Sequence, residues 1–223
     1  MVLDGDYYST FWILGVTCCG GIVTMILLAF FIKYDKIIPM KIVYVTGNMQ
    51  KVADARARLD RHGMSVEQQK VNTLEIQSDS IAEIARHKAQ QAYEIIGKPL
   101  VVNDAGWIIP ALKGFPGPYM RYINEWLTAS DLLALMKDKS DRSIVLKEVL
   151  AYHDGKKISV FEKDTFGTIV ESPRGGGGQE SDKVVCLDVA SGKTIAEQLD
   201  EDVGSDPIDQ DTVWDIFVKA MKV

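Results

Sequence analysis

The sequence predicts an α/β fold, in which helices flank a mixed central β-sheet, preceded by an N-terminal transmembrane helix. Three observations lead to this fold class. Apolar runs of strand length alternate with stretches of helical periodicity over residues 41–102. Residues 143–152 and 157–170 have the pattern of a long antiparallel hairpin around an Asp-Gly turn. Residues 11–32 form an apolar run without a charged side chain.

The apolar run at residues 11–32 meets the roughly 20-residue length that a helix needs to cross a bilayer. Lys33, Lys36 and Lys41 follow it, and the positive-inside bias therefore predicts a domain in the cytoplasm that is anchored to the membrane. Two alternatives stay open. Either the helix packs on the domain, or translation starts at Met40 and the protein is cytoplasmic and soluble.

Composition limits what the rest of the chain can be. With 223 residues, of which 47% are hydrophobic, residues 1–39 form a segment and residues 40–223 one domain with its own core. The formal net charge of −6 argues against a nucleic-acid partner, because binding to phosphate backbones needs clustered Lys and Arg. A phosphate ligand would have to be held by local groups. The three cysteines form no CxxC pair, which favours a reducing compartment.

The elements of the domain follow from periodicity and turn residues. A β-branched apolar run at residues 41–46 predicts the first strand. Val52, Ala55 and Leu59 then recur at helical spacing, and a second apolar stripe does so over residues 80–96. The expected order is strand 41–46, helix 50–62, strand 65–71, helix 80–96, strand 99–102, a Gly- and Pro-rich loop 114–118, helix 119–137, strands 143–152 and 157–170, strand 184–189 and helix 212–221.

The loop between the first strand and the first helix is a candidate phosphate site. Its backbone N–H groups and the positive end of the helix dipole suit phosphate oxygens. Thr46, Asn48 and Lys51 add a hydroxyl, an amide and a cation on either side of Gly47. Taken alone, the pattern is more typical of an ordinary helix cap at Asn48, with Lys51 on the surface.

Three further charged residues are candidates for chemistry. Lys88 falls on the apolar stripe of the second helix, where a lysine either extends to solvent or meets an anion. Asp104 closes an apolar strand at the end where open α/β sheets bind ligands, although a turn-capping aspartate has the same pattern. A carboxylate there can bind a metal ion or polarise water. Glu75, by itself, is typical of a solvated loop charge.

Read together, these residues and their spacing resemble the inosine triphosphate pyrophosphatase family. The resemblance covers residues 40–172, about three-quarters of the domain. The matching blocks are, in order, Lys-Ile-Val-Tyr-Val-Thr-Gly-Asn-x-x-Lys, Leu-Glu-Ile-Gln, His-Lys-Ala-Gln-Gln-Ala, Val-Val-Asn-Asp, Ala-Leu-x-Gly-Phe-Pro-Gly-Pro-Tyr and Gly-Thr-Ile-Val-x-x-Pro-Arg-Gly.

The resemblance implies an enzyme that hydrolyses non-standard purine nucleoside triphosphates, such as ITP, dITP and XTP, to the monophosphate and pyrophosphate. It also implies Mg²⁺ as cofactor, a cleft between two lobes and a homodimer. Glu75 and Asp104 would hold the metal ion, and Asp104 would be the catalytic residue that orients or deprotonates the attacking water. The residues that bind the substrate would be Thr46, Gly47, Asn48, Lys51, Lys88 and Phe115.

The chain departs from the family pattern mainly in its carboxy-terminal third. Asn103 replaces the first of two acidic residues. Residues 176–183 lack the aromatic side chain that would stack on the base, and residues 203–207 lack the family's lysine, histidine and arginine. Two hypotheses follow: an active pyrophosphatase with altered base preference, or a catalytically impaired, membrane-anchored nucleotide-binding protein of the same fold. The intact phosphate residues favour the first.

Overall fold

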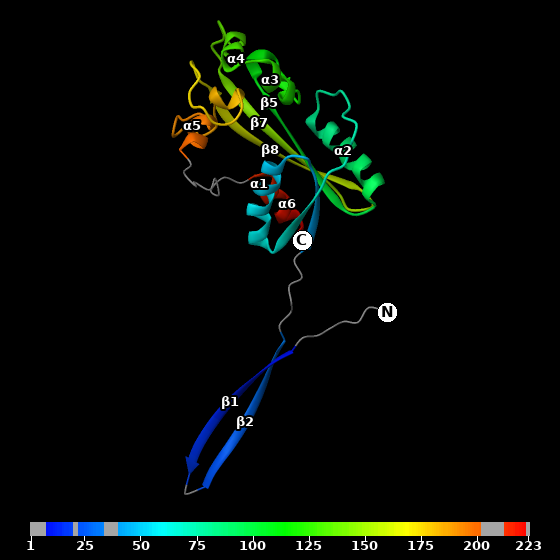
Figure 1. The fold of residues 1–223 in the computed structure, drawn as a ribbon, viewed down its shortest axis with the longest axis vertical. Coiled ribbons are helices and arrows are strands. Elements are labelled where there is room, and N and C mark those ends of the chain that lie inside the picture. The colour runs from blue at the N-terminus through cyan, green and yellow to red at the C-terminus, as the bar shows by residue number, and fades with distance from the viewer. Residues whose placement is uncertain (1–7, 20–21, 34–39, 202–211, 222–223) are drawn as a thin grey trace. The chain divides into compact units, whose positions relative to one another are not determined.

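The computed structural model describes residues 8–19, 22–33, 40–201 and 212–221. These residues belong to two compact units, Met1–Pro39 and Met40–Val223 (Figure 1). Each unit is described by itself below.

The first unit is a pair of antiparallel strands, so the predicted transmembrane helix at residues 11–32 is wrong. Strand β1 (Tyr8–Cys19) pairs with β2 (Ile22–Lys33) along its whole length. Within the described ranges, no helix is long and apolar enough to cross a membrane. The segment is rich in β-branched and aromatic residues, and a Gly-Gly dipeptide divides it in the sequence. Both features favour two strands over one continuous helix.

The second unit is built on the mixed sheet that the sequence predicted. Its strands lie in the order β4-β3-β5-β7-β8-β9, with the short β6 beside β5. Strand β3 is parallel to β4 and β5, whereas the other pairs are antiparallel. The strands are β3 (Met40–Val45), β4 (Met64–Gln69), β5 (Leu100–Ile108), β6 (Pro116–Gly117), β7 (Ser143–His153), β8 (Ile158–Ile169) and β9 (Val185–Cys186).

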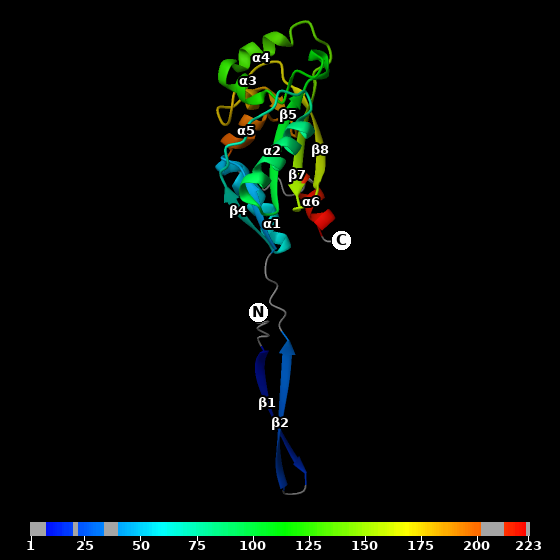
Figure 2. The same ribbon diagram turned by 90° about the vertical axis from the view of Figure 1, so that its right-hand side faces the viewer.

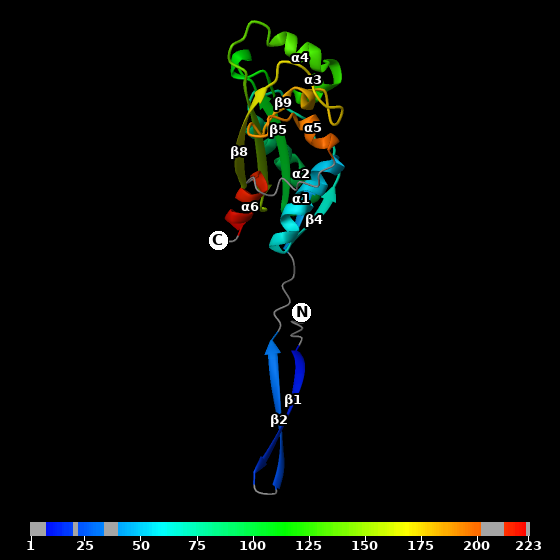
Figure 3. The same cartoon turned by 90° about the vertical axis from the view of Figure 1, so that its left-hand side faces the viewer.

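Helices cover both faces of this sheet, as Figures 2 and 3 show from opposite sides. Helices α1 (Met49–Leu59) and α6 (Val213–Met221) pack on one face around Tyr44, Val101 and Leu150. Helix α2 (Ile81–Ile96) packs on the other face against Val102 and Val149. Neighbouring residues of a strand point to opposite faces, so one strand serves both cores.

A third core lies at the far end of the long strands β5, β7 and β8. It contains Trp107, Ile144 and Val185, and α3 (Met120–Trp126), α4 (Ala129–Leu135) and α5 (Ile195–Asp200) surround it. The sequence predicted a single helix over residues 119–137. Two helices form instead, because Thr128 and Asp131 make a capping box that starts α4.

Strand β5 is longer than the four residues that the sequence predicted, and this changes the setting of the site. It pairs with β7 from Leu100 to Ile108. Its pairing with β3, by contrast, stops at Tyr44 and Val101. Asp104 therefore lies within a strand rather than at its end. On the side of β3, the backbone of β5 has no strand partner between Val101 and Trp107, where β6 pairs with it, and this stretch is open to the loop that follows β3.

Candidate active site

The loop between β3 and α1 begins the candidate site, and Asn48 is its helix cap. The Asn48 side-chain oxygen accepts hydrogen bonds from the backbone N–H groups of Gln50 and Lys51, at 2.8 and 3.2 Å. The backbone N–H of Asn48 donates to the Thr46 hydroxyl at 3.1 Å. The capping interpretation is therefore correct for Asn48. It does not exclude a phosphate site, because an ordered helix N-terminus still attracts anions.

Lys51 is not the surface residue that its place in the first helical turn suggested. Its ammonium group reaches across the open edge of β5 and donates to the backbone carbonyl of Asn103 at 2.9 Å. Burial lowers the pKa of Lys51, and the nearby Asp104 carboxylate acts in the opposite direction. Lys51 thus places a poorly solvated cation beside the β3–α1 loop, where an anionic ligand would compensate it.

Lys88 joins the other two charged candidates. Its ammonium group lies 2.7 Å from Asp104 Oδ1 and also contacts Glu75 Oε1. Burial lowers the pKa of Lys88, but the two carboxylates outweigh this effect, so the pKa is raised and the lysine is held as a cation. Lys88 therefore meets anions on the α2 face of the sheet and does not extend to solvent.

Asp104 keeps one oxygen for a ligand. Its Oδ1 is bound to Lys88, while its Oδ2 is buried without a hydrogen-bond partner among the described residues. A buried acceptor that lacks a donor is unfavourable unless a ligand, water or metal ion satisfies it. Glu75 is more open, with its side chain 55% exposed. The two carboxylates thus converge on one cationic group, and each has capacity for a further partner.

Two clefts adjoin this cluster, one on each face of the sheet. The narrower cleft has a volume of about 170 Å³ and lies on the α2 side, with Glu75, Asp104, Tyr119 and Tyr122 in its wall. The wider cleft has a volume of about 440 Å³, within the usual range for small-molecule sites. Ala105 lines both clefts. The open edge of β5 therefore forms a ridge between them.

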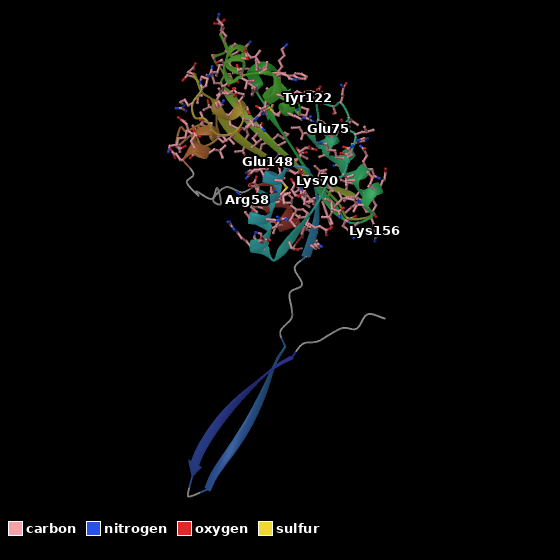
Figure 4. All side chains as sticks on the ribbon, viewed as in Figure 1. Arg58, Lys70, Glu75, Tyr122, Glu148 and Lys156 are labelled. Atoms are coloured by element: carbon pink, nitrogen blue, oxygen red, sulfur yellow. The ribbon has the colours of Figure 1, made fainter. Side chains whose placement is uncertain are left out.

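The wider cleft is lined by one face of the sheet together with α1 and α6. Lys51 and Asn103 lie at the edge of β5, and Glu148 lies on β7. Figure 4 labels Glu148 and Arg58 on this side, and Glu75 and Tyr122 towards α2 and α3. The remaining lining residues are Tyr44, Asp54, Ala57, Ala105, Leu146, Thr165, Leu187, Thr212 and Trp214.

The structure does not bring Phe115 to either cleft. Its ring is 40% exposed and lines a separate apolar pocket of about 30 Å³ beside Trp107 and Met120. The same Gly- and Pro-rich loop contributes Pro118 and Tyr119 to the narrower cleft instead. The loop therefore adjoins the narrower cleft through these two residues and not through Phe115.

Sequence reasoning missed Glu148 and Tyr44. Burial raises the pKa of Glu148, against the attraction of Lys51 and Arg58. The hydroxyl of Tyr44 is buried and makes no hydrogen bond among the described residues, and burial raises its pKa. A charged residue inside the apolar run of β7 was the available signal for Glu148. Tyr44 offered no comparable signal, because a tyrosine is common in strands.

The structure describes only part of the carboxy-terminal third, in which the sequence departs from the family pattern. Residues 203–207 lie outside the described residues. The glycine-rich loop is held to α5 by a bond from Gly176 N to Asp200 Oδ2, at 2.6 Å. Thr194 also donates to the carbonyl of Arg174 at 2.9 Å. This loop is therefore ordered by its own contacts, without the aromatic side chain of the expected pattern.

Known proteins resemble this chain over most of its length. The model of the Ham1 family matches residues 42–203. Inosine triphosphate pyrophosphatase 2 of Trypanosoma cruzi is 39% identical over 163 residues, which cover 73% of this chain and 83% of that protein. The dITP/XTP pyrophosphatase of Thermococcus kodakarensis is 33% identical over 163 residues, covering 73% of this chain and 88% of that protein.

The solved structures support the fold in the same way. A HAM1 protein from Coxiella burnetii matches with a TM-score of 0.66 and 22% sequence identity, over 82% of this chain and 98% of that one. At this identity the likeness establishes the fold alone. The family model, however, matches well over half of the sequence, and the relatives confirm the resemblance noted from the motifs. The chain belongs to the Ham1 family.

Proposed function

We propose that this protein hydrolyses non-standard purine nucleoside triphosphates, such as ITP, dITP and XTP, to the monophosphate and pyrophosphate. Relatives that are 33 and 39% identical carry the names dITP/XTP and inosine triphosphate pyrophosphatase. One observation in the structure carries the proposal. Lys88 lies against two carboxylates, and Asp104 among them keeps a buried oxygen without a partner. This cluster lies next to a helix N-terminus suited to phosphate.

Asp104 is the proposed catalytic residue. Its unpartnered Oδ2 would accept a hydrogen bond from a water molecule, and so orient it or take its proton as the water attacks at the α–β anhydride. Lys88 holds Oδ1, which fixes the plane of the carboxylate. The anhydride bond then breaks and pyrophosphate leaves with the bridging oxygen.

Cations on both faces of the β5 edge would neutralise the negative charge of the substrate. Lys51 supplies a cation on one face, and Lys88 supplies another on the opposite face. The β3–α1 loop with Thr46, Gly47 and Asn48 would contribute the backbone N–H groups of the helix N-terminus. Such fixed groups stabilise negative charge on the transferred phosphoryl group and on the leaving pyrophosphate.

The residues present fit a magnesium ion. Mg²⁺ in nucleotide enzymes commonly uses one or two protein carboxylates together with phosphate oxygens and water. Glu75 and Asp104 supply two such carboxylates beside Lys88, and each keeps capacity for a further partner, Asp104 through its buried Oδ2 and Glu75 through its exposed side chain. When bound there with the triphosphate, the ion would neutralise phosphate charge and favour departure of pyrophosphate.

We also infer that the protein forms a homodimer through the outer surface of α3 and the loop before it. Tyr119, Tyr122 and Trp126 are 38, 40 and 69% exposed there, and Phe115 is 40% exposed. The rings of Tyr122 and Trp126 lie 5.1 Å apart. Adjacent exposed aromatic side chains are typical of protein interfaces. Because Tyr119 and Tyr122 also line the narrower cleft, the partner would lie close to the active site.

Pyrophosphate release from the full chain tests the enzymatic proposal. We expect Mg²⁺-dependent release with ITP, dITP and XTP, and a loss of about 10²- to 10⁴-fold in kcat for Asp104→Asn, which keeps the shape of the side chain. Asp79→Asn is the matched control, since Asp79 is exposed and lines neither cleft. Nucleotide binding without release for every substrate would instead support the catalytically impaired alternative.

A further inference from the structure

The wider cleft contains a hydroxyl group, that of Tyr44, which has no part in the chemistry proposed above. Tyr44 is only 1% exposed, yet it lines this cleft. Its hydroxyl is buried and has no hydrogen-bond partner among the residues that the structure describes. A buried donor without an acceptor is unfavourable, and a ligand that offers an acceptor atom would relieve it. The hydroxyl therefore points to a ligand group inside the cleft.

The aromatic ring of Tyr44 is held in place from two sides. On β3, Tyr44 lies opposite Gln68 of β4 and Val101 of β5. Its ring contacts that of Trp214 on α6 edge to face, with 5.1 Å between the ring centroids. Both aromatic residues belong to the core beneath α1 and α6. The hydroxyl is therefore fixed before a ligand arrives, which lowers the entropic cost of a contact with it.

The surroundings of Tyr44 keep this hydroxyl protonated. Burial raises the pKa of Tyr44, and the carboxylates of Asp104, Asp54 and Glu148 raise it further. A tyrosine that keeps its proton can donate a hydrogen bond, and such a bond is stronger when the acceptor is ionised. Tyr44 is thus best suited to an anionic oxygen atom.

The place of Tyr44 in the sheet identifies that oxygen as part of a phosphate. Tyr44 comes two residues before Thr46, at the start of the β3–α1 loop. Lys51 lines the same cleft and bonds to the Asn103 carbonyl at the edge of β5. Leu146, on the far side of β5, belongs to β7. The α-phosphoryl group links the other phosphates to the sugar, so it would lie where the loop joins the cleft.

We propose that the Tyr44 hydroxyl donates a hydrogen bond to a non-bridging oxygen of the α-phosphoryl group of the substrate. This inference rests on the proposed function, since it places the phosphates at the edge of β5. Lys51 supplies a cation in the same cleft, which offsets repulsion between the phosphate and the carboxylates of Asp54 and Glu148. Tyr44 contacts neither sugar nor base, so it contributes equally to the binding of ITP, dITP and XTP.

The test uses Tyr44→Phe in the full chain, which removes only the hydroxyl. Binding of ITP, dITP, XTP, IMP and inorganic pyrophosphate is measured by calorimetry without Mg²⁺. The four nucleotides contain an α-phosphoryl group, and each should bind about tenfold less tightly than to the wild-type protein, the usual effect of a hydrogen bond to a charged group. Inorganic pyrophosphate should bind both proteins equally. With Mg²⁺, kcat/KM for pyrophosphate release should fall by the same factor as the affinity.

A thermal melt of the ligand-free protein separates a binding role from a structural one. Tyr44→Phe removes a buried donor that lacks an acceptor, so the variant should melt at a higher temperature than the wild-type protein. Tyr152→Phe is the matched control. Tyr152 also packs edge to face on an aromatic residue of α6, Phe217, but it lines neither cleft. This control should leave every affinity unchanged.

Three results would overturn the inference. Unchanged affinity of Tyr44→Phe for ITP and IMP would mean that the hydroxyl does not contact the nucleotide. A loss for ITP that dITP or XTP does not share would place the contact at the sugar or at the base. A lower melting temperature together with equal losses for all five ligands would show a structural role. The proposed function fails separately, if no substrate yields pyrophosphate, and in that case the binding of IMP still decides the role of Tyr44.

Discussion

The ammonium group of Lys88 lies 2.7 Å from the Asp104 carboxylate, joining helix α2 to the middle of strand β5. Glu75 contacts the same ammonium group from the loop before α2. The two carboxylates outweigh the effect of burial and raise the pKa of Lys88, so the lysine is held as a cation. It also leaves the second oxygen of Asp104 for a ligand.

Removal of the Lys88 charge should reduce activity strongly. Lys88→Met keeps the length of the side chain but leaves Asp104 without its partner and removes a cation from the phosphate site. We expect kcat for pyrophosphate release to fall by about 10²- to 10³-fold, as for other preorganised electrostatic groups. Lys156→Met is the control, since Lys156 is exposed in the hairpin turn and lines neither cleft. Retention of full activity in Lys88→Met would contradict the proposed role.

A side chain at position 106 should destabilise the domain. A Cβ atom on Gly106 would collide with the backbone carbonyl of Gly117 and would lie 2.7 Å from Ile81 Cδ1. We expect Gly106→Ala to lower the free energy of unfolding by about 1 to 3 kcal/mol, because the β6 backbone has to move. Gly47→Ala is the comparison, since a Cβ there meets no atom within 4 Å. Denaturant unfolding measures both, and equal stability of the two variants would refute the steric argument.

Asp215 should stabilise the fold in a pH-dependent manner. It accepts hydrogen bonds from Thr212 N at 2.7 Å and Thr212 Oγ1 at 2.8 Å, and it forms an ion pair with Arg58 at 3.3 Å. Burial raises the pKa of Asp215, but the Thr212 bonds and the Arg58 charge outweigh it, so the pKa is lowered. The stabilisation is therefore complete above the unfolded-state pKa, near 4, and is lost as the pH falls through the lower folded-state pKa.

Asp215→Asn should accordingly lower the melting temperature at pH 7, by an amount that corresponds to about 1 to 3 kcal/mol. The difference from the wild-type protein should shrink as the pH is lowered below about 4, since the wild-type carboxyl group then becomes protonated. Thermal melts between pH 7 and pH 3 measure it. A difference that stays constant over this range would show that the Asp215 charge is unimportant.

The aromatic surface of α3 should control the oligomeric state. Trp126→Glu places a charge in the centre of the proposed interface, and we expect it to convert a dimer to a monomer in light scattering after gel filtration. Phe166→Glu is a suitable control, because Phe166 is 71% exposed on β8 and is not part of the proposed interface. A wild-type protein that is monomeric at all concentrations would contradict the dimer.

Much of the fold and the site could be predicted without coordinates. The mixed sheet, α1, α2, α6 and the β7–β8 hairpin all have strong local periodicity, and each formed close to its expected range. Periodicity does not distinguish a long apolar helix from two paired strands, and this is why residues 11–32 were assigned wrongly. Periodicity also did not predict that a new helix starts at Thr128, since a helix cap depends on single residues.

The sequence by itself determined the family and the identity of the polar residues, because motif spacing is a property of the chain. Only the tertiary structure decided which groups those residues contact. The early end of β3 beside the longer β5 exposes the edge that Lys51 crosses, and the alternation of β5 places Asp104 on the α2 face. The same alternation in β7 leaves Glu148 in the wider cleft. Such contacts join residues far apart in sequence, so no local pattern encodes them.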